Sequence, residues 1–222
     1  RRPPRSTLSP SSAASDVYKR QVSMLSMYEI IELLAKNEIV IRPLLNPKEQ
    51  LQGASVDLRL GSEFKVFKRT NITHLKFEGT IPEIEEEFVR SADTILIREP
   101  PDKFILHPGE FALASTLEYV RLPPYIVAEI HGKSSWARLG LMVHSIAGFV
   151  DPGFSGTLTL ELINLGKVPI PLYVGVRIAQ LTFHKLNNYV PKYAGKYGGC
   201  GVKLSKVYEY EEFERIRQAE KK

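Results

Sequence analysis

Cysteine is almost missing from this sequence. The 222 residues contain a single one, Cys200, so the chain cannot form an internal disulfide framework or a multi-cysteine zinc site. This composition is typical of proteins in a reducing compartment, and we expect a cytoplasmic location. Long apolar runs are missing too: no stretch reaches the roughly 18 apolar residues of a membrane-spanning helix. The sequence therefore predicts no membrane partner.

Net positive charge is also small over most of the chain, although the total of +5 and the pI of about 9.2 suggest otherwise. Residues 1–23 hold five bases and one acid. The rest of the chain carries only about +1, which is too little for the many clustered phosphate contacts of a nucleic-acid-binding face. We expect no nucleic acid as partner.

Residues 1–23 are rich in Ser, Pro and Arg and lack hydrophobic periodicity. They contain no continuous apolar core of a secretory signal, although a basic, Ser-rich segment also suits a transit peptide. The string SSAASDVYKRQ resembles translated sequencing adapter. We therefore expect residues 1–23 to be a non-native or disordered leader, with the native start at Met24 or Met27.

The remaining chain predicts one domain over residues 24–210 and a charged tail or surface helix over 211–222. Ser26 and Glu29 have the spacing of a capping box, which predicts a short helix after Ser26. Its apolar residues recur at helical spacing: Met27, Ile30, Ile31 and Leu34. The acidic stretch 83–87 fits a helix or a loop insertion with a solvated face.

Most of the domain has the pattern of short β-strands separated by Gly and Pro turns, with Gly61 as one of the turn residues. Expected strands are 55–60, 63–67, 94–97, 104–106, 111–117, 126–130, 148–150, 157–163, 168–171 and 178–186. Many short strands at close spacing predict a mainly β barrel or sandwich.

A cluster of polar residues follows the strand expected at 126–130. It puts a flexible backbone, two hydroxyls and two cations within seven residues: Gly132, Lys133, Ser134, Ser135 and Arg138. Such groups suit an oxyanion such as a phosphate. The spacing is not that of a P-loop, and a polar turn with a surface arginine explains the composition equally well.

Glu161 lies in the middle of the strand expected at 157–163. Leu158, Leu160 and Leu162 should point to one face and Glu161 to the other. A carboxylate there costs desolvation free energy unless it is paired or functional, and burial would suit a general base or acid. A purely stabilising ion pair with Arg138 or Arg177 is the equal alternative.

Several long motifs in order resemble the dCTP deaminase family of the trimeric dUTPase superfamily. They are GASVDLRLG (53–61), LHPGEFALASTLEYVRLP (106–123), GKSSWARLGL (132–141), AGFVDPGFSGTLTLELIN (147–164) and GVRIAQLTF (175–183). The resemblance implies a distorted β-barrel or jelly roll that assembles as a homotrimer with active sites between subunits. It also implies hydrolytic deamination of dCTP to dUTP and ammonia, with Mg²⁺ bound through the triphosphate.

The resemblance assigns a role to individual residues of the matching motifs. Glu161 would be the general base and proton shuttle, while Ser134, Arg138 and the carbonyl of Ala147 would hold and polarise the water and the base. Asp151 would contact the 3′-hydroxyl. The remaining predicted nucleotide contacts are Lys133, Ser135, Thr159, Gln180, Tyr193, Lys196 and Tyr197, the last two closing over the phosphates.

Zinc is not expected, because zinc deaminases need a His/Cys ligand cluster that one cysteine cannot supply. The five histidines, His74, His107, His131, His144 and His184, show no ligand spacing and are expected to be structural. Deamination would then depend on protein groups to activate water.

Two alternatives to a pure deaminase remain open. Deaminase-only members of the family typically carry a bulkier basic pair where this chain has Gly148-Phe149, so a bifunctional enzyme that continues to dUMP and pyrophosphate is the first. There, Asp151 would activate a water for attack on the α-phosphate. The second is a non-catalytic nucleotide-binding trimer on the same fold, although the retained Ser134, Arg138 and Glu161 argue against it.

The C-terminal motif departs from the family pattern. The family commonly has K-Y-x-x-Q-x-G, whereas this chain has Lys196-Tyr197-Gly198-Gly199-Cys200-Gly201, without the glutamine. Closure over the phosphates is therefore less strongly predicted than the rest of the site. Cys200 is expected to be a small filler.

Overall fold

A computed structural model describes residues 23–68, 92–97, 102–144, 147–191, 193–195 and 197–204. The leader up to residue 22, the acidic stretch 83–87, Lys196 and the tail 211–222 lie outside the described residues. Within the described part, no helix is long and apolar enough to cross a membrane.

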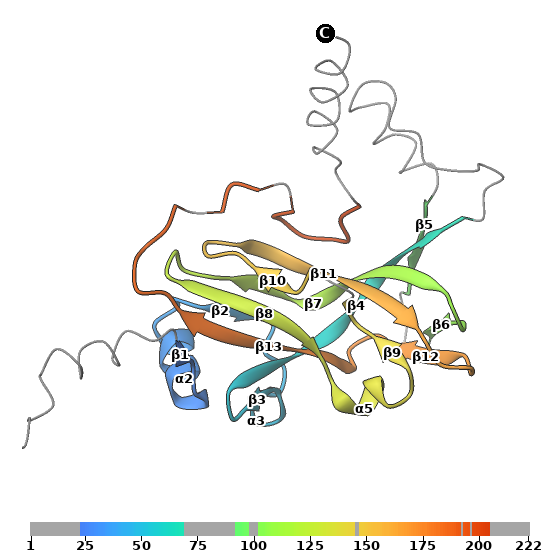
Figure 1. Cartoon of the computed structure of the whole chain (residues 1–222), viewed down its shortest axis with the longest axis horizontal. Coiled ribbons are helices and arrows are strands. Elements are labelled where there is room, and N and C mark those ends of the chain that lie inside the picture. Colours follow the sequence, from blue (N-terminus) through green and yellow to red (C-terminus); the bar gives the residue numbers. More distant parts are fainter. Residues whose placement is uncertain are drawn as a thin grey trace, which may run out of the picture.

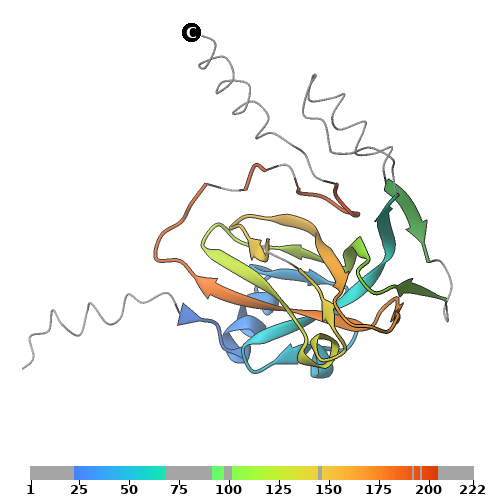
Figure 2. The same cartoon turned by 45° about the vertical axis from the view of Figure 1, so that its right-hand side comes forward.

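One curled sheet organises the described chain (Figures 1 and 2). Eleven strands belong to it, and every pairing is antiparallel. Its main path is β10 (Phe149–Val150), β8 (Ile126–Gly132), β13 (Arg177–Lys185), β4 (Ser55–Phe67), β7 (Phe111–Arg121), β11 (Ser155–Asn164) and β9 (Leu141–Met142). Four strands pair beside this path: β1 (Ser23–Met24), β2 (Val40–Arg42), β3 (Leu51–Gln52) and β5 (Ala92–Leu96). A separate pair joins β6 (Lys103–Leu106) to β12 (Ile170–Tyr173). The predicted mainly β fold is confirmed.

Strand β4 holds the two halves of the sheet together. Its first half pairs with β13 and its second half with β7 and β5. The prediction of two strands separated by a turn at Gly61 is wrong, because β4 continues through Gly61. A Cβ there would lie 2.7 Å from the Ser115 hydroxyl of β7, so this glycine permits a close approach of two strands and not a turn.

Helix α2 (Met27–Ala35) begins with the predicted capping box. The Ser26 side chain accepts from the Glu29 backbone N–H, and the Glu29 carboxylate accepts from the Ser26 N–H. The predicted apolar face is partly wrong. Ile30 is buried, but Ile31 is 41% exposed, and Leu33 and Leu34 pack on the core beside it.

Strand pairing begins before α2, at residues that precede the predicted start of ordered structure at Ser26. Ser23 and Met24 pair with Lys185 and His184 of β13, and the Leu25 N–H donates to the Phe183 carbonyl at 2.8 Å. Leu25 itself is buried. The last residue of the predicted leader thus already belongs to the sheet.

The shortest elements were not expected from the sequence. They are α3 (Pro47–Gln50), α5 (Ser134–Ala137), β2, β3 and β9. Elements of two to four residues are too short to show a hydrophobic period, and tertiary pairing decides them. Strands β7 and β11 also extend beyond their predicted ends, because their pairing with each other and with β2 continues there.

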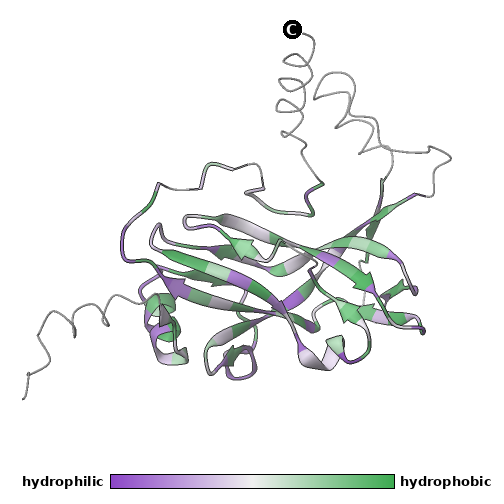
Figure 3. Cartoon of the chain, in the orientation of Figure 1, coloured by the Kyte–Doolittle hydropathy of each residue, from purple (hydrophilic) through white to green (hydrophobic). Residues whose placement is uncertain are grey.

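The core fills the inside of the curled sheet. Leu58, Leu160 and Phe183 come from three different strands and are completely buried. Phe64 of β4 stacks on Phe104 of β6 with ring centroids 4.6 Å apart, which joins the separate strand pair to the main sheet. Hydropathy colouring shows mostly hydrophobic strands, whereas α3 is mostly hydrophilic (Figure 3).

Candidate active site

Strand β11 presents Glu161 as the alternation predicted. Buried and half-buried residues alternate along its whole length, with Leu158 and Leu160 in the core and Thr159 and Glu161 on the opposite face. Neighbouring β7 holds this part of β11 in register, since Glu161 pairs with Leu113. The Glu161 N–H donates to the Val143 carbonyl at 3.0 Å. The carboxylate therefore projects from a rigid strand.

A cavity of about 470 Å³ lies over this face. Six of the predicted site residues line it, and we call this region the Glu161 cavity: Ala147, Asp151, Thr159, Glu161, Tyr193 and Tyr197. Aromatic side chains that the sequence had not singled out form an apolar wall, among them Phe67 and Phe111, whose rings stack at 5.7 Å. A volume of this size with few polar groups is typical of a small-molecule site.

The segment 197–204 lies above β11 in Figure 1, and its Tyr197 lines the Glu161 cavity. Its backbone N–H groups donate to the side chains of β11: Gly201 to Thr157 at 3.0 Å and Lys203 to Thr159 at 3.2 Å. Gly156 lets this segment approach, because a Cβ at that position would overlap the Gly199 carbonyl. Lys203 lines the cavity, and no motif had pointed to it.

Asp151 enters the cavity from a tight turn at Asp151-Pro152-Gly153, a sequence that by itself favours a turn. Gly153 has φ +80°, a left-handed conformation that glycine adopts without a Cβ clash, and the Phe154 N–H donates to the Asp151 carbonyl at 3.1 Å. The Tyr193 N–H binds the Pro152 carbonyl at 3.2 Å. The turn thus ties the C-terminal segment to the cavity rim.

His144 lies beside Glu161, although the sequence analysis treated it as structural. Burial lowers the pKa of its ring and nearby His131 lowers it further, while the charge of Glu161 opposes both. The ring also covers Gly148, since a Cβ there would lie 2.9 Å from it. An imidazole whose pKa is lowered therefore lies within electrostatic reach of the predicted base, and only the tertiary fold reveals this neighbour.

The other predicted site residues lie elsewhere on the chain. We call them the α5 surface: Lys133, Ser134, Ser135, Arg138 and Gln180. Helix α5 begins after Lys133, so the predicted polar turn is one short helix. The Trp136 indole N–H donates to the Arg177 carbonyl at 2.9 Å and fixes this helix to β13. Ser134, Ser135 and Arg138 are exposed.

Lys133 is held at this surface by a buried carboxylate. Its ammonium lies 2.6 Å from Asp57 Oδ2, and the Arg177 guanidinium lies 3.1 Å from the same oxygen. Arg177, one of the two arginines considered as partners of Glu161, also lies 3.7 Å from Glu49. Gln180 is opposite Asp57 in the sheet. The structure thus adds Asp57 to the surroundings of the predicted phosphate residues.

The two groups of predicted residues do not meet within one chain. None of the α5 surface residues lines the Glu161 cavity. Figures 1 and 2 show α5 at the lower edge of the molecule, while β10 and the segment after residue 190 lie at the upper side. Ser134 and Arg138 therefore do not line the cavity that contains Glu161.

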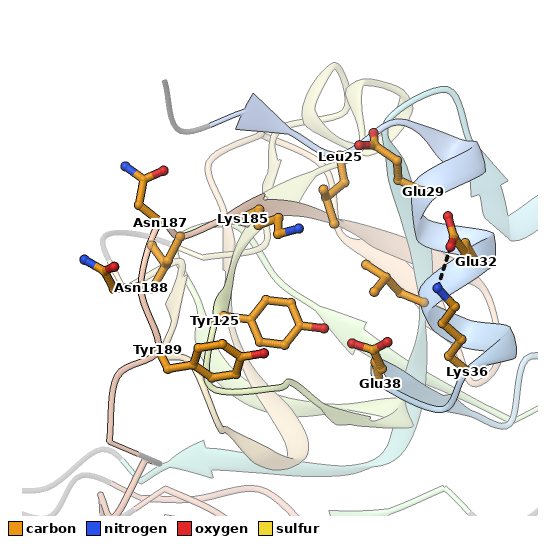
Figure 4. A pocket seen from close by; sticks show the side chains of 12 residues that line it. Leu25, Glu29, Glu32, Lys36, Glu38, Tyr125, Lys185, Asn187, Asn188 and Tyr189 are labelled. Carbon is orange, nitrogen blue, oxygen red and sulfur yellow. Dashed lines mark hydrogen bonds and ion pairs between the residues drawn. The ribbon is translucent and has the colours of Figure 1, made fainter. Parts of the chain in front are cut away.

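A second cavity, of about 410 Å³, lies between α2 and the end of β13 (Figure 4). Its polar groups are mostly engaged locally: Glu29 caps α2, Glu32 binds Lys36, and Lys185 lies over the Tyr125 ring. None of the predicted site residues lines it. It carries no support for the predicted chemistry.

Metal-ligating side chains are not clustered in the part of the chain that the structure describes. These residues form no group of three or more His, Cys, Asp or Glu that could hold a metal ion. Asp151 and Glu161 both line the Glu161 cavity, which gives it carboxylate oxygens of the kind Mg²⁺ prefers. This donor set fits a magnesium ion that arrives with a triphosphate better than a cage built by the protein.

Comparison with known proteins places the chain in a family. A family model described as dCTP deaminase-like matches residues 24–186. A dUMP-forming dCTP deaminase of Nanoarchaeum equitans is 44% identical over 184 residues, which cover 79% of this chain and 90% of that protein. A dCTP deaminase of Natronomonas pharaonis is 41% identical over 196 residues, or 86% and 97% of the two chains. The chain belongs to the dCTP deaminase-like family.

A solved structure agrees on the fold. The crystal structure of 2′-deoxycytidine 5′-triphosphate deaminase from Agrobacterium tumefaciens is similar with a TM-score of 0.57 at 23% identity. The match covers 75% of this chain and 49% of that one. The predicted family, its hydrolase class and its mainly β fold are confirmed, while the roles of individual residues stay predictions.

Proposed function

We propose that this protein is a dCTP deaminase that hydrolyses dCTP to dUTP and ammonia and supplies the deoxyuridine nucleotide branch of pyrimidine metabolism in the cytoplasm. The observation that carries the proposal is the placement of Glu161. Its carboxylate lies mid-strand in a cavity of about 470 Å³, together with Ala147 and Asp151 of the same motif. Family membership supplies the substrate class.

The chemistry follows from what each group can do. Glu161 takes a proton from water while the water oxygen bonds to C4 of cytosine, and returns it to the exocyclic amine, which leaves as ammonia. The Ala147 carbonyl accepts a hydrogen bond from that water. Ser134 and Arg138 donate to the base and stabilise the negative charge that develops on it.

The nucleotide itself would be bound by both regions. Asp151 accepts from the 3′-hydroxyl, and Thr159 and Tyr193 line the same cavity. Lys133, Ser135 and Gln180 hold the triphosphate with its Mg²⁺, and Lys196 and Tyr197 close over it from the C-terminal segment. Since Ser134, Arg138 and Lys133 lie outside the Glu161 cavity, the proposal includes a homotrimer whose sites form between subunits. Light scattering tests this assembly directly, and a stable monomer would contradict it.

A bifunctional enzyme is the second candidate. Several relatives bear the name "dCTP deaminase, dUMP-forming" and others the name "dCTP deaminase". This chain has Gly148-Phe149 beside Asp151, and His144 packs on Gly148 where a side chain would otherwise lie. Asp151 would then activate a second water for attack on the α-phosphate, with release of pyrophosphate.

One experiment tests both candidates. The Glu161→Gln variant removes the base but keeps the side-chain size, so ammonia release from dCTP should fall by about a thousandfold or more while dCTP still binds. Full activity in this variant would overturn the role of Glu161. Chromatography of the products with Mg²⁺ separates the candidates: dUMP and pyrophosphate support bifunctionality, and accumulation of dUTP contradicts it. Binding of dCTP to the unaltered protein without turnover would support a non-catalytic module.

A further inference from the structure

Asp57 is a buried charge that the proposed mechanism does not use. It lies on β4 with no exposed surface, and its Oδ2 is shared by the Lys133 ammonium at 2.6 Å and the Arg177 guanidinium at 3.1 Å. Its Oδ1 is buried without a hydrogen-bond partner among the described residues. Burying a carboxylate is costly unless it is paired. A residue with this cost and an unused oxygen calls for an explanation.

The sheet brings this cluster beside the predicted phosphate residues. Gln180 of β13 is opposite both Asp57 of β4 and His131 of β8. Residues that are opposite one another in a sheet point to the same face, so Asp57 and Gln180 share one face. Lys133 follows β8 directly and reaches the same face through its contact with Asp57.

Glu118 provides a comparison within the same chain. It is also completely buried, but both of its oxygens hold structure: one accepts from the Gln50 amide at 2.9 Å, the other from the Arg59 backbone N–H at 2.8 Å. Asp57, by contrast, binds only two long side chains that remain partly open to solvent, 21% exposed for Lys133 and 33% for Arg177. Glu118 orders the backbone, whereas Asp57 orders two cations.

The donors of the cluster suit an anion. Asp57 and Glu49 together balance the charges of Lys133 and Arg177, so the free N–H donors of the lysine are what an anion could use. A lysine ammonium has three N–H donors, and Asp57 takes up one of them, so two remain for an incoming oxygen. Arg177 continues to compensate the buried carboxylate when Lys133 shares its charge with a ligand. Lys133 also sits at the start of α5, directly before Ser134 and Ser135.

We propose that Asp57 is a positioning residue for the triphosphate: it holds the Lys133 ammonium toward the phosphates, and Arg177 keeps the buried carboxylate compensated. This inference rests on the proposed function, because it deepens the phosphate half of that site. It predicts that Asp57 acts on triphosphate affinity through Lys133 and has little effect on the chemical step.

Steady-state kinetics with dCTP and Mg²⁺ test the inference on the assembled enzyme. Asp57→Asn keeps the shape but removes the charge, so the KM for dCTP should rise about tenfold while kcat changes less than about twofold. Glu118→Gln is the matched control, because it alters a buried carboxylate that binds Gln50 and Arg59 and does not touch Lys133. It should leave the KM for dCTP unchanged.

A double variant separates positioning from a general loss of structure. Lys133→Met keeps the aliphatic stem and leaves Asp57 paired with Arg177, so it should fold and raise the KM for dCTP at least as much as Asp57→Asn. If Asp57 acts through Lys133, the combined variant should be no worse than Lys133→Met alone. Additive effects of the two substitutions would overturn the proposal. If Asp57→Asn does not fold, Arg177→Met provides the test, because Asp57 then binds Lys133 alone and the KM should rise.

Inorganic tripolyphosphate with Mg²⁺ makes the test independent of turnover. It should raise the melting temperature of the unaltered protein, and Asp57→Asn should lose most of this shift. That result without deamination of dCTP would overturn the proposed function and leave the inference standing. Normal deamination by Asp57→Asn, with an unchanged KM for dCTP and an unchanged shift of the melting temperature, would overturn the inference alone. Tighter binding of tripolyphosphate by Asp57→Asn would also overturn it, as would the absence of a shift in both proteins.

Discussion

The Glu161 cavity and the α5 surface are built in opposite ways. The cavity stands on the long strands β7 and β11, which are held by many backbone pairings, and the segment 197–204 covers it. The α5 surface stands on a four-residue helix with exposed serines and an exposed arginine. Rigid strands suit a base that must hold one geometry, whereas partly exposed cations suit a hydrated triphosphate. Under the proposed function, one chain would supply two halves of a site that differ in rigidity and exposure.

Mixing two inactive variants tests this division most severely. Glu161→Gln removes the base from the cavity and Arg138→Met removes the cation from the α5 surface, and each alone should lose about a thousandfold in deamination. In mixed trimers, an intact half from each subunit should meet at one of the three sites of a cyclic assembly, or about a third of all sites. Co-purification through two affinity tags, followed by an ammonia assay, measures the recovery.

The control is each variant mixed with itself, which should stay inactive. Mixed trimers that remain inactive would show that both residues must act in the same subunit. The proposal that the Glu161 cavity of one subunit is completed by the α5 surface of another would then be wrong. A rearrangement within one chain would have to bring Arg138 to Glu161.

Displacing the segment 197–204 from β11 should reduce activity less than the loss of Glu161 or Arg138. It should affect the Glu161 cavity and leave the α5 surface unchanged. In Gly156→Val the new side chain would overlap the Gly199 carbonyl, so the covering segment must move away from β11. We expect the KM for dCTP to rise about tenfold from the loss of closure, measured by steady-state kinetics. Gly198→Val is the control, because a Cβ at residue 198 meets only the Ser155 carbonyl at 3.5 Å, an ordinary contact. Equal effects of the two substitutions would contradict a role for Gly156 in this approach.

The smallest expected effect concerns the contribution of the buried Glu118 carboxylate to stability. Burial raises the pKa of Glu118 above its ordinary value of 4.5, although the hydrogen bonds from Arg59 and Gln50 lower it in part. The folded state therefore holds its proton more tightly than the unfolded state. The stability from this group is present below pH 4.5 and is lost as the pH rises through the raised pKa.

Urea unfolding at a fixed protein concentration measures this effect. Glu118→Gln should destabilise the protein by roughly 1–3 kcal/mol, because a buried donor is left facing another donor. The deficit relative to the unaltered protein should shrink as the pH rises from below 4.5 toward neutrality. A deficit that grows with pH would contradict the raised pKa.

Local signals in the sequence were enough for several features of the fold. The capping box at Ser26 and Glu29 fixed the start of α2, because both partners lie within one turn. The alternation around Glu161 fixed the faces of β11, because neighbouring side chains of a strand always point to opposite faces. The Asp-Pro-Gly turn placed Asp151 for the same kind of local reason.

Other features could not be read from neighbouring residues. Gly61 looks like a turn residue, but it lies inside β4 because another strand passes within 2.7 Å of its missing Cβ. Ile31 fits the helical period but faces solvent, since the position of the sheet decides which side of α2 is covered. Asp57 belongs to no local pattern of charge, and its partners lie 76 and 120 residues away in the chain.

The sequence by itself determined the family, the mainly β class and the identity of the predicted catalytic residues, because ordered motifs and alternation are local properties. Only the tertiary structure decided how those residues are grouped. It placed Glu161 and Asp151 in one cavity, put Lys133 and Arg138 on another surface, and set the buried Asp57 behind Lys133. Strand pairing and chain crossing create these neighbours, and neither leaves a trace in the spacing along the chain.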